Sequence, residues 1–267
     1  MPSTVRDATL LVGGAGLAYA LVVGLAAGGI VLPRAMLPIL LALPATVVLW
    51  TRLAGGDASG ARRLMAAWAA GLVVLGTIAM SIAPEAAAEV VAFGPEYRDE
   101  MLHWVMTGEG AEGDLGAFLP IHLRRLALFA PLALITGGAL ALAMGAVMVN
   151  YMNLFVASYA AAAGGAAGLL AWFPWALCRI AAFTILGVLL AEPLIRWFRA
   201  RRDNARRQGG DTAPVLDDAS FLHTLSHIVT PRRGRVLAWV AVLLALDVLL
   251  KALLAPAWGE HLASLLP

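Results

Sequence analysis

Long uninterrupted runs of apolar residues alternate along the chain with short polar segments. Crossing the hydrocarbon core of a bilayer takes about 20 apolar residues in a helix. Only helices and closed barrels satisfy their backbone hydrogen bonds in lipid. The pattern therefore predicts an all-α, polytopic transmembrane bundle of about seven spans, near residues 8–31, 35–51, 64–83, 126–149, 151–172, 174–195 and 236–256.

The second of these runs is the weakest, because it is short and contains Pro38 and Pro44. Proline removes a backbone donor and kinks or breaks a helix. We expect this run to span, with a re-entrant segment as the alternative. If the run re-enters, the N-terminus lies on the outer side instead.

The distribution of charge predicts the orientation of the spans. Residues 196–207 and 232–235 are rich in arginine, whereas residues 85–122 contain eight acidic side chains and one basic side chain, Arg98. Because cytoplasmic loops carry an excess of positive charge, we predict a cytoplasmic N-terminus and an outer C-terminus in a bacterial inner (cytoplasmic) membrane. Arg124 and Arg125 run against this rule.

Composition excludes a soluble domain. Hydrophobic residues make up 61% of the chain and charged residues 13%, whereas soluble domains have roughly 25% charged residues. The one cysteine, Cys178, excludes a disulfide framework and a cysteine-based metal site. The basic residues lie mostly at span ends, where orientation explains them, so we expect the lipid bilayer and not nucleic acid as a partner.

The same pattern divides the chain into five parts. We expect an amphipathic surface helix at 96–106 within the acidic segment, and an interfacial helix at 221–228 within the basic loop. The five parts are 1–84 with three spans, the acidic extracytoplasmic segment 85–122, a Gly/Ala-rich three-span core 123–196, the basic cytoplasmic loop 197–235, and the last span with its outer tail, 236–267.

Four ionisable residues lie inside the predicted spans, where charge is costly and often functional. Asp247 and Lys251 are four residues apart, so they share a helix face and can pair. Arg179 and Glu192 are thirteen residues apart in one span and cannot touch, so each needs another partner. Because both lie near span ends, snorkelling to the interface is the alternative.

The segment from Leu246 to Lys251 resembles the last helix of microbial rhodopsins, where an aspartate precedes by four the lysine that carries retinal. The resemblance covers these few residues only. No earlier predicted span offers a central carboxylate as counterion, so we do not expect retinal.

A second candidate group lies on the outer side. Glu100 and His103 are three residues apart and would share a helix face, with His122 at the start of the next span. Carboxylate and imidazole side chains bind divalent metals, so a metal-dependent membrane enzyme is one interpretation. The other is a solvated face that docks a partner. No HExxH, Walker A or dinucleotide motif occurs, so an enzyme is not the expected reading.

Small residues are dense in the central part of the chain. They let helix backbones approach closely, so we expect the fourth and fifth spans to pack tightly against each other or against a second subunit. Asn150 and Asn153 are expected at the inner turn between these spans, closing helix ends. The small residues are Gly137, Gly138, Gly145, Gly164, Gly165 and Gly168.

From His122 to Ile195 the order of features resembles the stage II sporulation protein M family. There, a span with small residues reaches an Asn-Gly turn, a Gly/Ala-rich span follows, and a Pro-His-Gly…Glu motif opens the next. Asn150 and Pro174 are the counterparts here, but Tyr151 replaces the family's Gly and Trp175 its His. The resemblance implies a non-enzymatic protein that assembles or anchors other proteins in the membrane.

We therefore expect an integral membrane subunit or scaffold of a multiprotein complex, which acts by helix packing and by docking partners. Its partners would be other membrane subunits or a second copy. The alternative is a secondary transporter or ion-conducting protein in which Asp247 and Lys251 line a path, with prolines supplying broken helices. The further alternative is the metal-dependent enzyme at Glu100, His103 and His122.

Overall fold

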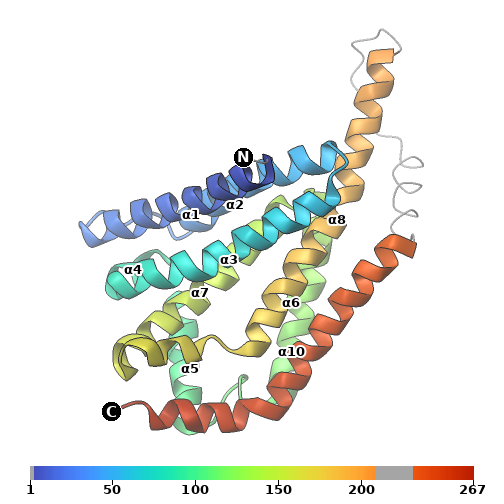
Figure 1. Ribbon diagram of the computed structural model, residues 1–267. Helices are drawn as coiled ribbons and strands as arrows, with labels where there is room; N and C mark the ends of the chain where they lie inside the picture. The colour runs from blue at the N-terminus through green and yellow to red at the C-terminus, as the bar shows by residue number, and fades with distance from the viewer. Residues whose placement is uncertain (1–2, 208–230) are drawn as a thin grey trace.

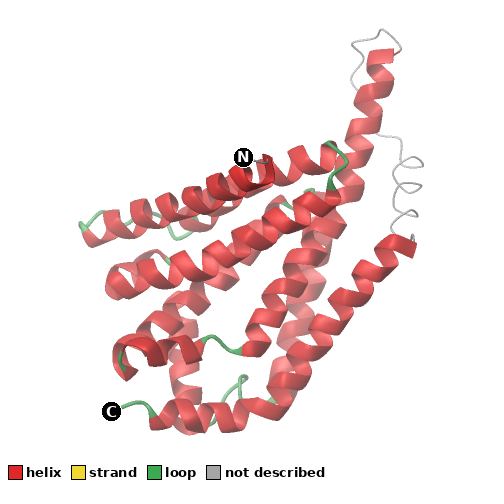
Figure 2. Ribbon diagram, in the orientation of Figure 1, coloured by secondary structure: helices red, strands yellow, loops and turns green. Residues whose placement is uncertain are grey.

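The computed structural model describes residues 3–207 and 231–267, and this part of the chain is helical apart from its connecting turns (Figure 2). Seven of its helices are long and apolar enough to cross a membrane. The prediction of an all-α bundle with about seven spans is therefore confirmed. The seven are α1 (Ser3–Ala27), α2 (Met36–Ala54), α3 (Ala58–Ile82), α6 (Leu115–Ile135), α7 (Ala139–Ala163), α8 (Pro174–Arg207) and α10 (Pro231–Ser264) (Figure 1).

Helix α2, the weakest of the predicted spans, is continuous over 19 residues. Pro38 lies in its first turn, where backbone N–H groups have no intrahelical partner in any case. Pro44 lies inside the helix without ending it. Helix α2 is thus long enough to cross the membrane.

The bounds predicted for the fourth and fifth spans are wrong. The turn between α6 and α7 lies at Gly137 and Gly138, whose φ angles of 58° and 91° are in the left-handed region. Glycine adopts this region without the penalty that a Cβ atom brings. The predicted start of the fourth span is also too late, because Arg124 and Arg125 interrupt the apolar run there. Helix α6 instead follows an N-cap, Asp114, whose side chain accepts a hydrogen bond from Gly116 N.

The predicted cytoplasmic loop 197–235 is in part helical. Helix α8 continues to Arg207, and α10 begins at Pro231. The interfacial helix predicted at 221–228 lies outside the described residues.

Three shorter elements follow α3 and α7: α4 (Pro84–Val90), α5 (Gly94–Thr107) and the 3₁₀ helix η1 (Gly165–Ala171). Helix α5 covers the stretch where we expected a surface helix, and it packs on α7 and α10. Helix α7 contacts α2, α3, α5 and α6. In its most apolar stretch 61% of the residues are buried, against 17% in the corresponding stretch of α10. Helix α7 is therefore central and α10 peripheral.

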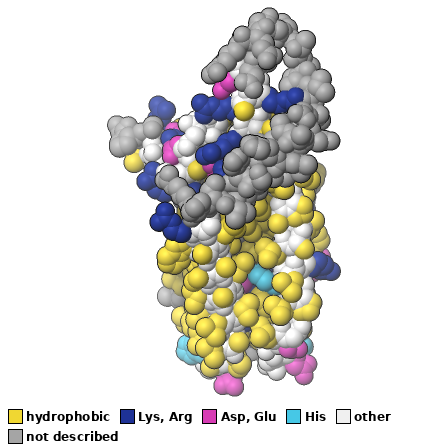
Figure 3. Space-filling view, turned by 90° about the vertical axis from the view of Figure 1, so that its right-hand side faces the viewer, with side chains coloured by type: hydrophobic (Ala, Val, Ile, Leu, Met, Phe, Trp, Pro, Cys, Tyr) yellow, Lys and Arg dark blue, Asp and Glu magenta, His cyan; other side chains and the backbone are white. Residues whose placement is uncertain are grey.

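One face of the molecule shows the charge segregation expected of a membrane protein. Lys and Arg side chains gather at one end of this face, above a belt of hydrophobic side chains (Figure 3). Some Asp, Glu and His side chains lie at the opposite end. The belt indicates contact with a lipid bilayer.

Three of the six glycines predicted at helix contacts lie where backbones or side chains approach closely. A Cβ atom on Gly137 would be 2.8 Å from Ile195 Cδ1, and one on Gly138 would be 2.8 Å from Leu49 Cδ2. Gly168 would meet Ala160 Cβ at 2.1 Å. No atom lies within 4 Å of the corresponding position at Gly145, Gly164 or Gly165.

Candidate functional site

An Arg–Asp pair joins α8 to α10 inside the bundle. Arg179 donates two hydrogen bonds to Asp247, from Nε to Oδ2 at 2.9 Å and from Nη2 to Oδ1 at 2.8 Å. The Asp247 side chain is fully buried, and that of Arg179 is 16% exposed. The two parallel bonds fix the guanidinium plane as well as its charge.

A second pair lies beside the first and brings the acidic segment 85–122 into the bundle. Lys251 Nζ is 2.9 Å from Glu112 Oε2, and Trp175 Nε1 donates a 2.6 Å hydrogen bond to Glu112 Oε1. At this distance Lys251 and Glu112 form an ion pair. Glu112 thus ties the loop before α6 to both α8 and α10.

Two rings of α6 complete this group of side chains. Phe118 lies under both cations, with its ring centroid 3.8 Å from Lys251 Nζ and 4.7 Å from Arg179 Cζ. Such contacts stabilise cations best where water is excluded. His122 stacks on Phe118, and its Nε2 is 3.8 Å from Asp247 Oδ2. We call these side chains the charge cluster: Glu112, Phe118, His122, Trp175, Arg179, Asp247 and Lys251.

Each carboxylate of the charge cluster is paired with a cation, Asp247 with Arg179 and Glu112 with Lys251. Burial raises the pKa of the Glu112 carboxyl, but the positive charges of Lys251 and Arg179 and the hydrogen bonds from Lys251 and Trp175 together outweigh burial, so its pKa lies below the usual value. A buried ion pair gains little over an apolar replacement, while a lone buried charge is costly. The cluster therefore holds α6, α8 and α10 in one arrangement.

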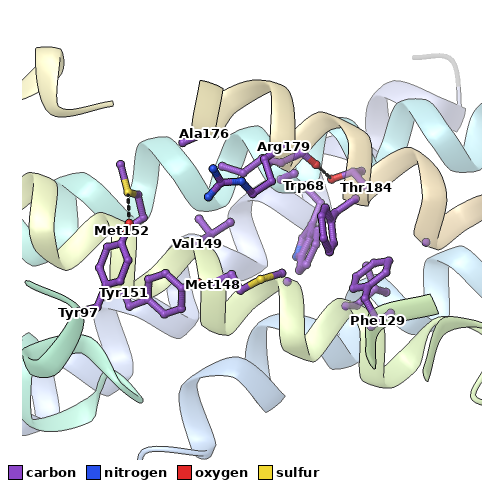
Figure 4. A pocket seen from close by; sticks show the side chains of 17 residues that line it. Trp68, Tyr97, Phe129, Met148, Val149, Tyr151, Met152, Ala176, Arg179 and Thr184 are labelled. Carbon is purple, nitrogen blue, oxygen red and sulfur yellow. Dashed lines mark hydrogen bonds between the residues drawn. The ribbon is translucent and has the colours of Figure 1, made fainter. Parts of the chain in front are cut away.

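A narrow slot adjoins the charge cluster between α3, α5, α6, α7 and α8 (Figure 4). Its walls are mainly apolar, and it contains about 70 Å³ of free space. One water molecule needs roughly 10–15 Å³, so the slot has room for several small groups. It extends from Ala176 to Gly187 along α8 and from Ala141 to Met152 along α7.

One end of the slot is polar. Arg179 reaches over Val149 at this end, near Tyr97 and Tyr151, while Phe129 lies at the other end (Figure 4). The ring centroids of the two tyrosines are 4.3 Å apart, and Arg125 Cζ is 5.7 Å from the Tyr151 ring centroid. The slot is therefore an apolar channel with cationic and hydroxyl groups at one end.

The ionisable residues predicted in the spans are paired, but not as their spacing suggested. Asp247 and Lys251 share a face of α10, yet each pairs with a residue of another element. Glu192 of α8 contacts Arg196 in the next turn and Arg233 of α10, the latter at 3.2 Å. Helices α8 and α10 are thus joined by two ion pairs, Arg179–Asp247 and Glu192–Arg233.

The residues predicted for a metal do not come together. Glu100 and His103 are exposed on α5, whereas His122 is buried in the charge cluster beside Asp247. Residues 3–207 and 231–267 contain no group of three or more His, Cys, Asp or Glu side chains arranged for a metal ion.

The prediction that Asn150 and Asn153 form a turn is wrong, since both are buried within α7. Tyr19 of α1 donates a hydrogen bond to Asn150 Oδ1 at 2.5 Å. Asn153 Nδ2 donates to Leu72 O of α3 at 3.0 Å, and Thr77 donates to Asn153 Oδ1. In lipid, polar side chains on helices find partners on neighbouring helices, so these asparagines join α7 to α1 and α3.

Sequence reasoning missed Glu112, Phe118 and Trp175. Glu112 lies among glycines in a segment with seven other acidic residues, so no local signal distinguishes it. Phe118 fell in the predicted acidic segment, ahead of the span expected from residue 126, and Trp175 read as an apolar residue at the start of a span. Only the folded arrangement shows that they surround cations of α8 and α10.

Comparison with known proteins adds no relative to this picture. No protein-family model, curated protein or solved structure matches the chain.

Proposed function

We propose that the protein binds an amphipathic molecule, with an anionic head and one slender apolar chain, in the slot beside the charge cluster. The observation that carries this proposal is the position of Arg179, which lines an otherwise mainly apolar slot while Asp247 holds its guanidinium from the other side. A charged group at the end of an apolar channel matches the chemistry of a lipid.

The length of the slot supports an apolar chain confined to one leaflet. Gly187 lies eleven positions after Ala176, which at about 1.5 Å per residue corresponds to roughly 16 Å of helix. The hydrocarbon core is about 30 Å thick, so the slot is about as long as one leaflet is deep. A compact polar solute would leave most of these walls uncovered.

The polar end suits a phosphate or carboxylate. Asp247 fixes Arg179 through Nε and Nη2, and arginine recognises such anions through its remaining donors. Arg125 and the rings of Tyr97 and Tyr151 lie nearby, and the Tyr97 hydroxyl donates a hydrogen bond to Met152 Sδ. In the predicted orientation this end faces the outer leaflet.

Photo-crosslinking tests the proposal. The purified protein is incubated in mixed micelles with a lysophosphatidylglycerol analogue, which has a single acyl chain, carrying a diazirine in that chain. We expect crosslinks on slot residues such as Val149 and Phe183. Gly145 lines the slot and has open space at its Cβ position, so Gly145→Leu fills the slot and should lower crosslinking there several-fold.

The matched control is Gly14→Leu, which also adds a side chain in open space but in α1, outside the slot. It should crosslink like the wild type. Arg125→Gln should reduce the preference for the lysophosphatidylglycerol analogue over a lysophosphatidylcholine analogue. Equal crosslinking in the wild type and Gly145→Leu, or crosslinks spread over the outer surface alone, would contradict the proposal.

A role as a membrane-complex subunit is the second candidate, and α10 favours it. Its most apolar stretch is only 17% buried, and Trp239, Leu249 and Leu253 are exposed on it. These side chains face either lipid or another subunit. Purification in a mild detergent tests this role: partners that co-purify with the wild type and are lost in Leu249→Lys support it, while a lone monomer contradicts it.

A further inference from the structure

We infer that a second, separate site binds an anionic phospholipid of the cytoplasmic leaflet in a hollow at the inner ends of α2, α6 and α8. The hollow has a volume of about 820 Å³. It lies at the opposite end of α8 from the charge cluster and shares no lining residue with the slot. The inference therefore does not depend on the proposed function.

The walls of the hollow are apolar and contain aromatic rings. Trp50 of α2 is 42% exposed, and Phe198 of α8 is 51% exposed. Trp50 donates a hydrogen bond to Gly137 O at 2.8 Å, which fixes the ring against the turn after α6. Ile135 and Leu194 extend the apolar surface. Aromatic side chains with one polar atom are typical of the membrane–water interface.

The rim of the hollow is cationic. Arg199 donates a hydrogen bond to Ala54 O and lies 3.7 Å from Asp203 Oδ2. Arg202 also lines the hollow and is exposed. Two guanidinium groups against one carboxylate leave a net positive charge beside the apolar wall. A phosphate at the arginines and an acyl chain along Trp50 and Phe198 satisfy both features.

A phospholipid explains this combination better than a free anion. Inorganic phosphate would use the arginines but leave the exposed rings unoccupied. Basic pockets between membrane helices on the cytoplasmic side bind anionic lipid headgroups. The predicted orientation places the arginine-rich end of α8 on that side.

The test measures the thermal stability of the purified full chain in detergent with added phosphatidylglycerol, phosphatidylcholine or inorganic phosphate, in a Gly145→Leu background that fills the slot. We expect phosphatidylglycerol to raise the melting temperature of this parent protein and the other two additions to leave it unchanged. The double variant Arg199→Gln, Arg202→Gln should lose the increase. Because Arg199 also bonds to α2, Arg202→Gln alone is a milder variant and should lose part of the increase.

The matched control is the double variant Arg6→Gln, Arg63→Gln. It removes two exposed basic residues from the same predicted side, outside the hollow. It should keep the response to phosphatidylglycerol. The inference is overturned if the control loses the response equally, if both arginine variants keep it in full, or if inorganic phosphate alone reproduces it.

Discussion

At the scale of single residues, the charge cluster shows how charged side chains are accommodated inside an apolar bundle. Glu112 and Lys251 are both largely buried, with 10% and 2% of their side-chain surfaces exposed. Their mutual contact, together with Trp175 and Phe118, replaces solvation. The energetic importance of such a pair lies in the penalty for breaking it, because a lone buried charge has no compensation.

Removing one partner of this pair should therefore cost more than removing both. Lys251→Leu or Glu112→Leu alone is expected to lower the free energy of unfolding by about 3–5 kcal/mol, measured by denaturant unfolding in detergent. The double variant should recover most of this loss. The exposed Arg98–Asp99 pair serves as control, since Arg98→Leu should cost less than about 1 kcal/mol. Strictly additive losses would contradict the coupling.

Glu112 should also make stability depend on pH. Its pKa in the folded protein lies below its ordinary value of 4.5. The contribution is therefore fully present above pH 4.5 and is lost as the pH falls towards the lower, folded pKa. The melting temperature of the wild type should fall in this acidic range, and Glu112→Gln should show a flatter curve. Parallel curves for the two proteins would rule out Glu112 as the source.

At the scale of helices, contacts depend on polar groups as well as on small residues. Asn150 and Asn153 join α7 to α1 and α3 through side-chain hydrogen bonds. The close approach that these bonds need is provided by Gly76 of α3, where a Cβ atom would lie 2.0 Å from Asn153 Nδ2 and 2.7 Å from Tyr19 Oη. Gly76 was not among the glycines selected from the sequence.

Gly76→Ala should therefore destabilise the bundle. The added methyl group forces α3 and α7 apart or displaces the Asn153 side chain, and overpacking of this kind typically costs about 1–3 kcal/mol. Gly14→Ala is the control, since no atom lies within 4 Å of its Cβ position, and its free energy of unfolding should not decrease. Denaturant unfolding in detergent measures both. Equal stability of the two variants would show that α3 and α7 adjust freely.

At the scale of the whole molecule, the seven long helices and the charged ends lead to a topology that can be measured. An odd number of spans places the two termini on opposite sides. Helix α2 has the length of a span, which favours the predicted cytoplasmic N-terminus over the re-entrant alternative. The side of the membrane on which each end lies stays a prediction.

Cysteine labelling tests this topology. In a Cys178→Ser background, a single cysteine that replaces Arg6 or Asp203 should react with an impermeant maleimide only after the membrane is permeabilised to give access to the cytoplasmic side. Cysteines at Glu85 and Glu260 should react from the outside in intact cells. All four positions are solvent-accessible in the fold. Outside labelling at Arg6 together with protection at Asp203 would show that α2 does not cross.

The sequence by itself determined that the chain is a helical membrane bundle. Lipid offers no hydrogen bonds to the backbone, so each span must be a long apolar helix, and such helices are visible as runs in the sequence. The number of spans followed from these runs. So did the four ionisable residues inside them, because charge is rare in such a background.

Only the tertiary structure decided which side chains meet. Asp247 and Lys251 share a face of α10 but pair with Arg179 and Glu112, which lie 68 and 139 positions away in the sequence. The turn at Gly137 was hidden for a similar reason, since an apolar run continues across it. Lipid requires helices to be apolar and paired, but the choice of partner depends on packing between distant helices, which no local pattern contains.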